Sequence, residues 1–428
     1  MAGGRVTVGV NKLSIKRILL MLPFISTIWL FWFINSSQLA VVLRWTAENG
    51  QGTRRMEFTK MRKLFKERKI QMDSVCNMQS VKSYHQVFPP VPDIFHYYPR
   101  VKAAVCKTRH LGTVILPKIM NILDSKLPSG KKKFDLTQYS IDDLKFNINI
   151  DILRERDEVD VNYIIIGRNP YDRILAHYIE GMSVVSELNR QIGRTFRKPM
   201  DKVTLDGKSF ICGFQVDFQD YADYLLQNIL KPGFYNADLE LPIVRQCAPC
   251  NVKYTYMFKQ ETLTDDIFQI MNATKMNPVY RKIINQLLDG DIDERSLYLD
   301  EYVTETMAYH RHHKQDCPET LALLYKLWRS LQNQGILHAD SKFPLEFFVK
   351  LKGRPTIVTD TIRIIREDVK HNPLTIEQRD RQRQEQFRHY DLLNQVTMDK
   401  IKVAYKVDFI MFGYDSSSPP GDLKRKAP

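Results

Sequence analysis

Cysteine is scarce in this sequence, with six residues among 428. A small scaffold built on disulfides is therefore excluded. The chain shows no internal repeat. Its composition, with 43% hydrophobic and 26% charged residues, also excludes a fully disordered or fibrous protein. At roughly 100–200 residues per domain, the length allows two domains or one large α/β domain with appendages.

Acidic residues are in the minority. The chain has 63 Lys and Arg against 49 Asp and Glu, which gives a net charge of +14 at pH 7. Such an excess indicates a polyanionic partner, although it would also serve solubility alone.

One long apolar run lies near the N-terminus, from Ile18 to Ile34, and is interrupted only by Ser26 and Thr27. No acidic residue precedes it, and the basic residues before it are Arg5, Lys12, Lys16 and Arg17. This asymmetry predicts a cytosolic tail at residues 1–17 and a transmembrane signal anchor at 18–38, with the rest of the chain in the lumen.

The alternative to an anchor is a cleaved secretory signal peptide, for which Ser37–Ala40 would be a poor cleavage site. Without the four basic residues before the span, the predicted lumenal part has 59 of the 63 Lys and Arg residues against 49 Asp and Glu residues. A cationic lumenal protein does not normally meet DNA or RNA, so a nucleic-acid partner is not expected. The polyanions available to it are acidic glycans, anionic lipid head groups and nucleotide sugars or nucleotide sulfates.

Two N-glycosylation sequons lie on the predicted lumenal side, at Asn35 and Asn272. Asn35 is too close to the predicted bilayer to be a good acceptor, so Asn272 is the expected glycosylation site. Because a three-residue pattern also arises by chance, the sequons only support the topology.

The lumenal part divides into a stem at 39–95, a domain at 96–415 and a disordered tail at 416–428. Within the stem, the strongly basic stretch Arg54–Lys69 predicts an exposed helix. Within the domain, residues 275–400 have mostly helical patterns.

Short apolar segments separated by helical patterns predict the fold of this domain. The predicted strands are Ala103–Cys106, Asn162–Ile166 and Val252–Phe258. The predicted helices are Ile119–Leu123, a helix from Tyr171 onward, Asp217–Leu230 and Glu261–Met271. Strand–turn–helix units in series predict an α/β fold in which helices flank a parallel sheet.

The first predicted strand leads into a loop that is suited to an anion. This loop contains Arg109, and Thr113 stands at the predicted start of the next helix, where backbone N–H groups can bind an anion. The GxxxxGK[ST] spacing of a Walker loop is absent, and an ordinary strand–helix turn is the alternative interpretation.

The second predicted strand ends close to Arg168, at the edge where open parallel sheets bind their ligands. Pro170 suits the first turn of the helix that follows. A planar, permanently charged guanidinium at this place favours a phosphate, and a surface arginine is the alternative.

Four segments together resemble a known family. The order Arg-x-Pro-x-x-Arg, which begins at Arg168 and continues to Tyr178, is similar to the 3′-phosphate-binding segment of Golgi carbohydrate sulfotransferases. More specifically, it is similar to the chondroitin 4-O-sulfotransferase and HNK-1 sulfotransferase group. Residues 109–115 fall where that group keeps its 5′-phosphosulfate-binding segment. Cys247–Leu263 resembles its Cys-x-Pro-Cys segment with the Lys-x-Glu-Thr-Leu continuation, and Tyr405–Tyr414 resembles its C-terminal signature.

The resemblance implies transfer of a sulfonate group from 3′-phosphoadenosine 5′-phosphosulfate (PAPS) to a glycan hydroxyl, without a metal. It implies a sulfotransferase fold with a P-loop-NTPase-like core, in a single-pass type II Golgi membrane protein. The implied acceptor is an acidic or neutral glycan, such as chondroitin or a glycoprotein glycan, and the oligomeric state stays open.

The resemblance also implies the site residues. For nucleotide binding they are Arg109, His110, Leu111, Gly112, Thr113, Val114, Arg168, Arg173 and Ala176. Arg109 would act in catalysis by stabilising the leaving bisphosphate. His110 and His177 are candidate general bases for the acceptor hydroxyl, and each could equally be a packed or exposed histidine.

Three departures from the family pattern matter for activity. Ala176 replaces the phosphate-binding Ser, Arg109 replaces a Lys, and Leu239 and Glu240 replace a His-Trp pair. These losses keep a second hypothesis open, in which the protein is a catalytically inactive, membrane-anchored glycan-binding protein on the same fold.

The Cys247-x-x-Cys250 pair has further interpretations. It could be half of a zinc site, with partners among His310, His312, His313 and Cys317. A redox dithiol is another alternative. In an oxidising lumen, disulfides are the expected outcome, with pairing undetermined among Cys76, Cys106, Cys212, Cys247, Cys250 and Cys317.

Overall fold

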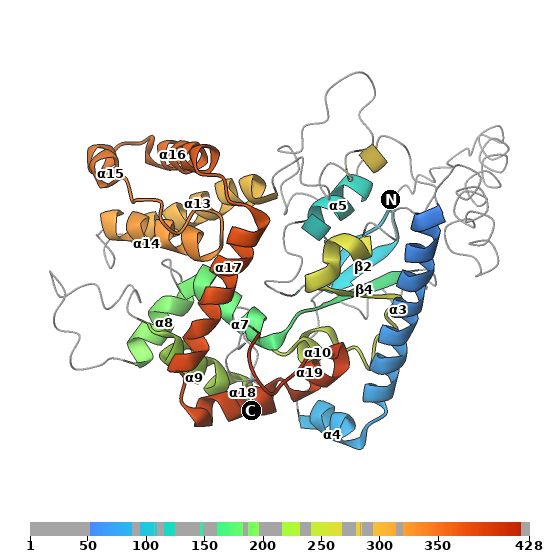
Figure 1. Ribbon diagram of the computed structural model, residues 1–428. Helices are drawn as coiled ribbons and strands as arrows, with labels where there is room; N and C mark the ends of the chain where they lie inside the picture. The colour runs from blue at the N-terminus through green and yellow to red at the C-terminus, as the bar shows by residue number, and fades with distance from the viewer. Residues whose placement is uncertain are drawn as a thin grey trace, which may run out of the picture. The chain divides into compact units, whose positions relative to one another are not determined.

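A computed structural model describes residues 52–87, 95–106, 108, 115–124, 146–148, 161–182, 187–196, 216–231, 241–267, 280–282, 284, 294–313 and 320–420. The chain forms two compact units, Met1–Leu64 with Thr264–Ile283, and Phe65–Leu263 with Ile284–Pro428. The second unit contains the sheet and the helices that surround the candidate site (Figure 1).

The sheet is mixed, with the strand order β3-β1-β2-β4-β5. The strands are β1 (Phe95–Tyr98), β2 (Ala103–Cys106), β3 (Phe146–Ile148), β4 (Asn162–Gly167) and β5 (Tyr256–Lys259). β4 pairs in parallel with both β2 and β5, with Val105 opposite Ile164 and Ile164 opposite Tyr256. The predicted parallel strands therefore exist and are neighbours, in the α/β arrangement that the sequence indicates.

The predicted parallel sheet is confirmed for β2, β4 and β5 but not for the other two strands, because β1 runs antiparallel to β2 and to β3. A tight turn joins β1 to β2, and Lys102 within it has a positive φ of 46°. Two strands joined by so short a turn must run antiparallel. The hairpin begins at Phe95, the last residue of the predicted stem.

The strand after the Cys-x-Pro-Cys segment is shorter than predicted. Val252 belongs to a turn instead, since its N–H donates to the carbonyl of Ala248 at 3.1 Å. Ala248 has a left-handed backbone with φ of 43°, which ends helix α10 (Ile243–Cys247). Only Tyr256–Lys259 is left to pair with β4.

The predicted helices of this unit are present. They are α5 (Ile115–Asp124), α7 (Pro170–His177) with its π-helical continuation η2 (Tyr178–Met182), and α9 (Phe218–Ile229). Asp217 caps α9, because its side chain accepts a 2.8 Å hydrogen bond from the N–H of Asp220. A short 3₁₀ turn, η5 (Gln260–Thr262), begins the helical stretch predicted from Glu261, which the structure describes as far as residue 267.

The region predicted to be mostly helical between residues 275 and 400 consists of helices joined by short turns where the structure describes it. Its elements are α13 (Glu294–His312), α14 (Thr320–Asn333), α15 (Leu345–Leu351), α16 (Ile357–His371), α17 (Ile376–Gln386) and η6 (Phe387–Leu392), followed by α18 (Gln395–Ala404) and α19 (Lys406–Phe412). α13–α16 share one apolar core, which includes Trp328 and Phe348. α7, α8 (Glu187–Thr195), α9, η6, α18 and α19 share another, which includes Tyr171 and Phe409.

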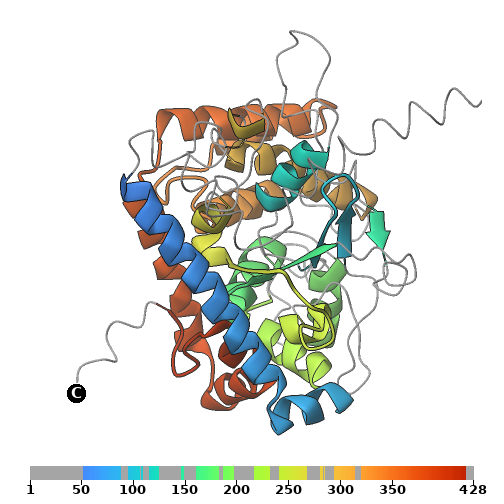
Figure 2. The ribbon, with the colours of Figure 1, turned by 90° about the vertical axis from the view of Figure 1, so that its right-hand side faces the viewer.

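The predicted basic helix is α3 (Gly52–Cys76). Lys66 and Lys69 are exposed as expected, but Arg68 is buried, so the prediction of an exposed helix is wrong at this residue. Arg68 donates to the carbonyl of Met257 on β5 at 3.2 Å, and the Phe65 ring lies 6.4 Å from that of Tyr256. From Phe65 onward, α3 thus packs against the sheet (Figure 2).

Disulfides fix the Cys-x-Pro-Cys segment to two distant elements. Cys76 at the end of α3 bonds to Cys250, and Cys106 at the end of β2 bonds to Cys247. The prediction of disulfides is confirmed for these four residues, and Cys212 and Cys317 lie outside the described residues. A zinc site or a redox dithiol formed by Cys247 and Cys250 is excluded, because each sulfur is bonded to a different partner.

The terminal predictions fall mostly outside the described residues, which begin at residue 52. Among the residues that are described, no helix is both long and apolar enough to cross a membrane. At the other end, the Ser416 carbonyl accepts a 2.8 Å hydrogen bond from the Tyr171 hydroxyl. A disordered tail therefore stays a prediction only for the residues beyond Pro420.

Candidate anion-binding site

The site is built where β4 ends and α7 begins (Figure 1). β4 ends at Gly167, and Phe412 of the C-terminal segment lies against this residue. A Cβ atom at position 167 would lie 2.3 Å from Cδ1 of Phe412. A larger residue here would displace the ring, so the glycine lets the C-terminal segment approach the end of the strand.

The turn from β4 into α7 is fixed by local hydrogen bonds. The Asn169 side chain caps α7 by accepting a 3.0 Å hydrogen bond from the N–H of Tyr171. Pro170 occupies the first helical position, where its missing N–H costs no hydrogen bond. The backbone N–H of Asn169 donates to Oε1 of Glu261 at 3.0 Å, which ties this turn to the segment after β5.

Arg168 lies between the strand and this cap, and Asp172 holds it in place. Its Nε donates a 2.7 Å hydrogen bond to Oδ2 of Asp172, and the two side chains are only 11% and 8% exposed. Burial alone would lower the pKa of Arg168, but the nearby carboxylates, above all Asp172 with its hydrogen bond, more than offset this effect and raise it. The carboxyl end of β4 therefore carries a fixed positive charge.

Asp172 also binds a second arginine. Nη2 of Arg383 on α17 donates to the same oxygen, Oδ2. Burial opposes ionisation of Asp172, but the two guanidinium groups dominate and its pKa is lowered. Asp172 is therefore a carboxylate at neutral pH. It is shared by Arg168 and by Arg383, which follows Asp172 by 211 positions in the sequence.

The C-terminal segment closes one side of the site. The Tyr414 hydroxyl donates a 2.6 Å hydrogen bond to Oε2 of Glu261, and Nζ of Lys259 lies 4.7 Å from the centre of the Tyr414 ring. Burial raises the pKa of the Tyr414 hydroxyl, and the neighbouring Glu261 raises it further. Through Glu261, three of the four segments that resemble the sulfotransferase group meet at the start of α7.

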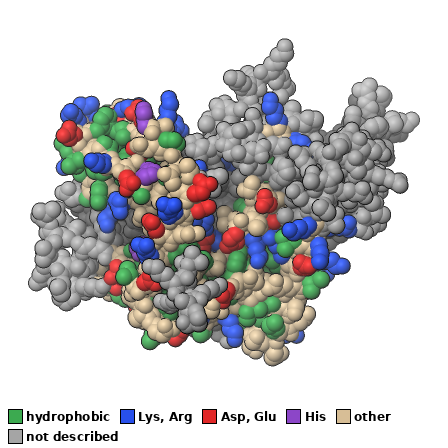
Figure 3. Space-filling model, in the orientation of Figure 1, with side chains coloured by type: hydrophobic (Ala, Val, Ile, Leu, Met, Phe, Trp, Pro, Cys, Tyr) green, Lys and Arg blue, Asp and Glu red, His purple; other side chains and the backbone are tan. Residues whose placement is uncertain are grey.

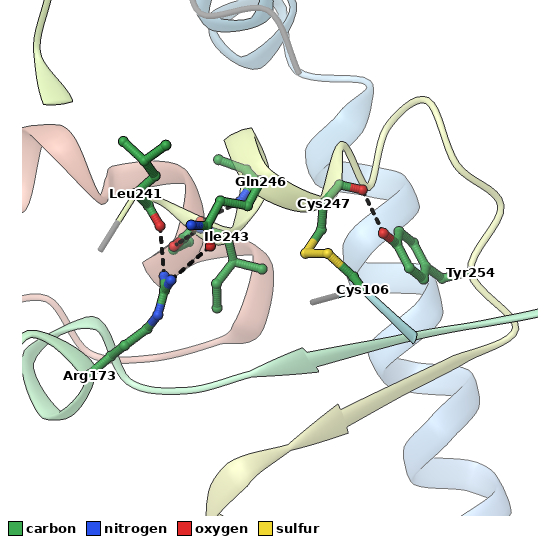
Figure 4. Close-up of a disulfide and its surroundings, with 9 residues drawn as sticks. Cys106, Arg173, Leu241, Ile243, Gln246, Cys247 and Tyr254 are labelled. Atoms are coloured by element: carbon green, nitrogen blue, oxygen red, sulfur yellow. Dashed lines mark hydrogen bonds between the residues drawn. A yellow bond between two sulfur atoms is a disulfide. The ribbon is translucent and has the colours of Figure 1, made fainter. Parts of the chain in front are cut away.

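Arg173 does not belong to this edge. Its side chain is fully buried and reaches the segment before Cys247, where Nη1 donates to the Leu241 carbonyl and Nη2 to Oε1 of Gln246, both at 2.8 Å (Figure 4). A phosphate could reach this guanidinium only by displacing these partners. The implied nucleotide-binding role of Arg173 stays a prediction, and in this structure the side chain joins α7 to the segment that carries the disulfide.

Asp408 of the C-terminal segment supports the same region. Its carboxylate accepts hydrogen bonds from the N–H groups of Ile243 at 2.7 Å and Val244 at 3.0 Å, at the start of α10. Burial raises the pKa of Asp408 to about 6, against the opposing effect of nearby Arg173.

His177 is a packed histidine. It is 3% exposed, and its Nδ1 lies 2.8 Å from the Tyr221 hydroxyl. A Cβ atom at Gly181 would lie 3.2 Å from its ring, so the next turn of the chain packs closely on it. His177 as a general base therefore stays a prediction, and in this structure its ring is packed among core side chains.

Ala176, directly before His177, is more exposed than the rest of α7. Every other residue of α7 is buried, whereas Ala176 is half-buried. It follows Asp172 by four positions, so both residues lie on one side of the helix. Position 176 is thus on the side of α7 that carries the partner of Arg168.

The remaining site predictions concern residues that the structure does not describe. Arg109, His110, Leu111, Gly112, Thr113 and Val114 lie outside the described residues, as do Asn35, Leu239, Glu240 and Asn272. The chain leaves β2 at Cys106, next to β4 in the sheet, and Thr108 is buried. The loop after β2 therefore starts at the same edge of the sheet as Arg168.

Sequence reasoning missed Asp172, Glu261 and Arg383 as parts of the site. Asp172 has a local signal, because it stands four residues after Arg168 on a predicted helix, the spacing of an ion pair. Arg383 has none, since only the packing of α17 brings it to α7.

A family model described as the sulfotransferase family matches residues 99–330, which is more than half of the chain. Neither a search of curated proteins nor a search of solved structures finds a match. The matched range contains β2, β4, Arg168 and Asp172. On this evidence the chain belongs to the sulfotransferase family, and its domain supports a sulfotransfer activity.

Proposed function

We propose that this protein transfers a sulfonate group from PAPS to a hydroxyl of a glycan. One observation carries the proposal: Arg168, at the carboxyl end of β4, is a permanently charged group with an 11% exposed side chain, held by the buried Asp172. Such a charge favours the 3′-phosphate of the nucleotide, in agreement with the family match over this region.

The proposed sulfonate transfer requires a group that stabilises the charge of the leaving nucleotide and a base that deprotonates the acceptor hydroxyl. The acceptor oxygen attacks the sulfur of PAPS, the bond from sulfur to the phosphate oxygen breaks, and its electron pair leaves with 3′,5′-ADP. Arg168 binds the 3′-phosphate, and Arg109 stabilises the charge that develops on the leaving 5′-phosphate. The acceptor hydroxyl loses its proton to a base, for which His110 is the proposed residue because His177 is packed in the core.

The proposed setting is the lumen of the Golgi, with a single-pass type II anchor at residues 18–38. The disulfides support an oxidising compartment. The basic excess beyond the anchor supports an acidic glycan acceptor such as chondroitin, and neutral glycoprotein glycans belong to the same proposal.

Glycosidase treatment of the expressed protein should increase its mobility, and Asn272→Gln should remove most of that shift. A C-terminus accessible to protease in intact microsomes would overturn this orientation.

The direct test uses the full chain purified in detergent, radiolabelled PAPS and a panel of desulfated glycosaminoglycans and glycoprotein glycans. We expect label to enter at least one acceptor, and Arg168→Ala to abolish most of the incorporation. The matched control is Arg388→Ala, which removes an exposed arginine on η6.

A second candidate, an inactive glycan-binding protein, is favoured by Ala176, which provides no hydroxyl on the half-buried side of α7. Retention of a glycan on the immobilised chain, without nucleotide binding at millimolar 3′,5′-ADP, would select this candidate.

A further inference from the structure

Asp172 joins two parts of the second unit that are far apart in the sequence. Its Oδ2 accepts hydrogen bonds from Nε of Arg168, next to β4, and from Nη2 of Arg383, on α17. The Arg383 side chain is 53% exposed, whereas that of Asp172 is 8% exposed. Arg383 therefore reaches inward from the surface to a buried carboxylate that holds the proposed phosphate-binding arginine.

Helix α17 is firmly placed for this contact. A capping box between Thr375 and Gln378 fixes its N-terminus. Gln382, directly before Arg383, is buried and donates to the carbonyls of Gln332 at 3.0 Å and Leu337 at 3.1 Å. α17 is thereby attached to the end of α14. Its Arg383 contacts Asp172 of α7, so α17 links the α13–α16 region to α7.

The position of the Asp172 carboxylate depends on both arginines. A carboxylate that accepts two charge-assisted hydrogen bonds at one oxygen has less freedom than one with a single partner. Both guanidinium groups also favour its ionised form against the effect of burial. Loss of Arg383 would therefore leave Arg168 paired with a looser and less firmly ionised partner.

We propose that Arg383 is a positioning residue, which acts through Asp172 to hold Arg168 for the 3′-phosphate of the nucleotide. This inference rests on the proposed function and deepens it. It makes α17 the element that connects the α13–α16 region to nucleotide binding.

Calorimetric titration of the full chain with 3′,5′-ADP tests the inference, with 5′-AMP as the ligand that lacks the 3′-phosphate. Arg383→Ala should weaken 3′,5′-ADP binding about tenfold, the effect of losing one charge-assisted hydrogen bond, and should hardly change 5′-AMP binding. In an Arg168→Ala background, the same substitution should change 3′,5′-ADP binding by less than about twofold, because the residue it positions is gone.

Two matched variants separate positioning from general damage. Arg381→Ala removes an exposed arginine two positions away on the same helix, where acidic and basic side chains are mixed on the surface (Figure 3), and should leave binding unchanged. Arg383→Lys keeps the charge but not the planar group, and should restore part of the lost affinity. Thermal unfolding of each variant checks the fold.

Two results would overturn the inference while the wild type binds 3′,5′-ADP. One is an unchanged affinity in Arg383→Ala, and the other is an equal loss in both backgrounds, which would indicate that Arg383 acts independently of Arg168. A wild type that binds no nucleotide would overturn the proposed function itself, and this result is distinct from the other two.

Discussion

The two sides of helix α7 differ in what they do with the same kinds of side chain. On one side, Asp172 holds Arg168 at the carboxyl end of β4, and Ala176 is half-buried. On the other side, Arg173 is fully buried with the Leu241 carbonyl and Gln246, and His177 packs on Tyr221. Arg168, Arg173 and His177 are all of residue types expected in a sulfotransferase site. Their hydrogen-bond partners differ between the two sides of the helix.

The comparison teaches that the hydrogen-bond partners of an arginine indicate its role better than its place in the sequence motif does. Arg173 is bonded to a backbone carbonyl and a neutral amide, so its role is to join α7 to the disulfide-bearing segment. Arg168 is bonded to a carboxylate that a second arginine shares. Substitutions on the two sides should therefore change different quantities: the free energy of unfolding on one side and nucleotide affinity on the other.

The largest effect is expected from Arg173→Ala. It removes two charge-assisted hydrogen bonds in the core and leaves a cavity, and should lower the free energy of unfolding by about 3–5 kcal/mol. Denaturant titration of the full chain measures this loss, with Arg388→Ala as the exposed control. A loss below about 1 kcal/mol would show that the Arg173 side is not the structural one.

Arg168→Ala should act mainly on the ligand. PAPS and 3′,5′-ADP binding should weaken by about 1.5–3 kcal/mol, the usual contribution of a charge-assisted hydrogen bond. Its unfolding free energy should fall less than that of Arg173→Ala, because Asp172 keeps Arg383 as a partner. Unchanged nucleotide affinity in a folded variant would remove Arg168 from the site.

His177→Phe keeps the ring volume and removes the hydrogen bond with the Tyr221 hydroxyl. The free energy of unfolding should fall by about 0.5–1.5 kcal/mol. The pH profile of sulfonate transfer should keep its shape, since the proposed base is His110. Loss of a basic group from that profile would contradict the packing assignment.

The smallest effect is expected from Ala176→Ser, on the side of Asp172. An added hydroxyl on this half-buried face should tighten 3′,5′-ADP binding by about 0.5–1.5 kcal/mol, the net contribution of one hydrogen bond. Calorimetric titration of both proteins measures the difference. Equal affinities would indicate that position 176 does not face the phosphate.

Much of the frame of the site could be predicted from the sequence. The uninterrupted apolar run of β4 indicated a buried parallel strand, and Pro170 with the following spacing indicated α7. The β1–β2 hairpin was missed because Phe95–Tyr98 lacks the polar–apolar alternation that marks an antiparallel strand with one solvated face, as all four residues are buried.

The division between the two sides of α7 could not be predicted in the same way. The family motif contains Arg168 and Arg173 alike, and only the tertiary packing of Arg173 against Leu241 and Gln246 encloses this one. Arg383 could not be selected either. It lies in a polar helix that also contains Arg379 and Arg381, and tertiary packing alone brings it to Asp172.

The most direct test of the account compares 3′,5′-ADP with 5′-AMP on the wild type and on Arg168→Ala, by calorimetric titration of the full chain. The account predicts that the wild type prefers 3′,5′-ADP by about 10–100-fold, since Arg168 binds the 3′-phosphate, and that the preference falls close to one in the variant. The same preference in both proteins, or no binding of either nucleotide to the wild type at millimolar concentration, would contradict it.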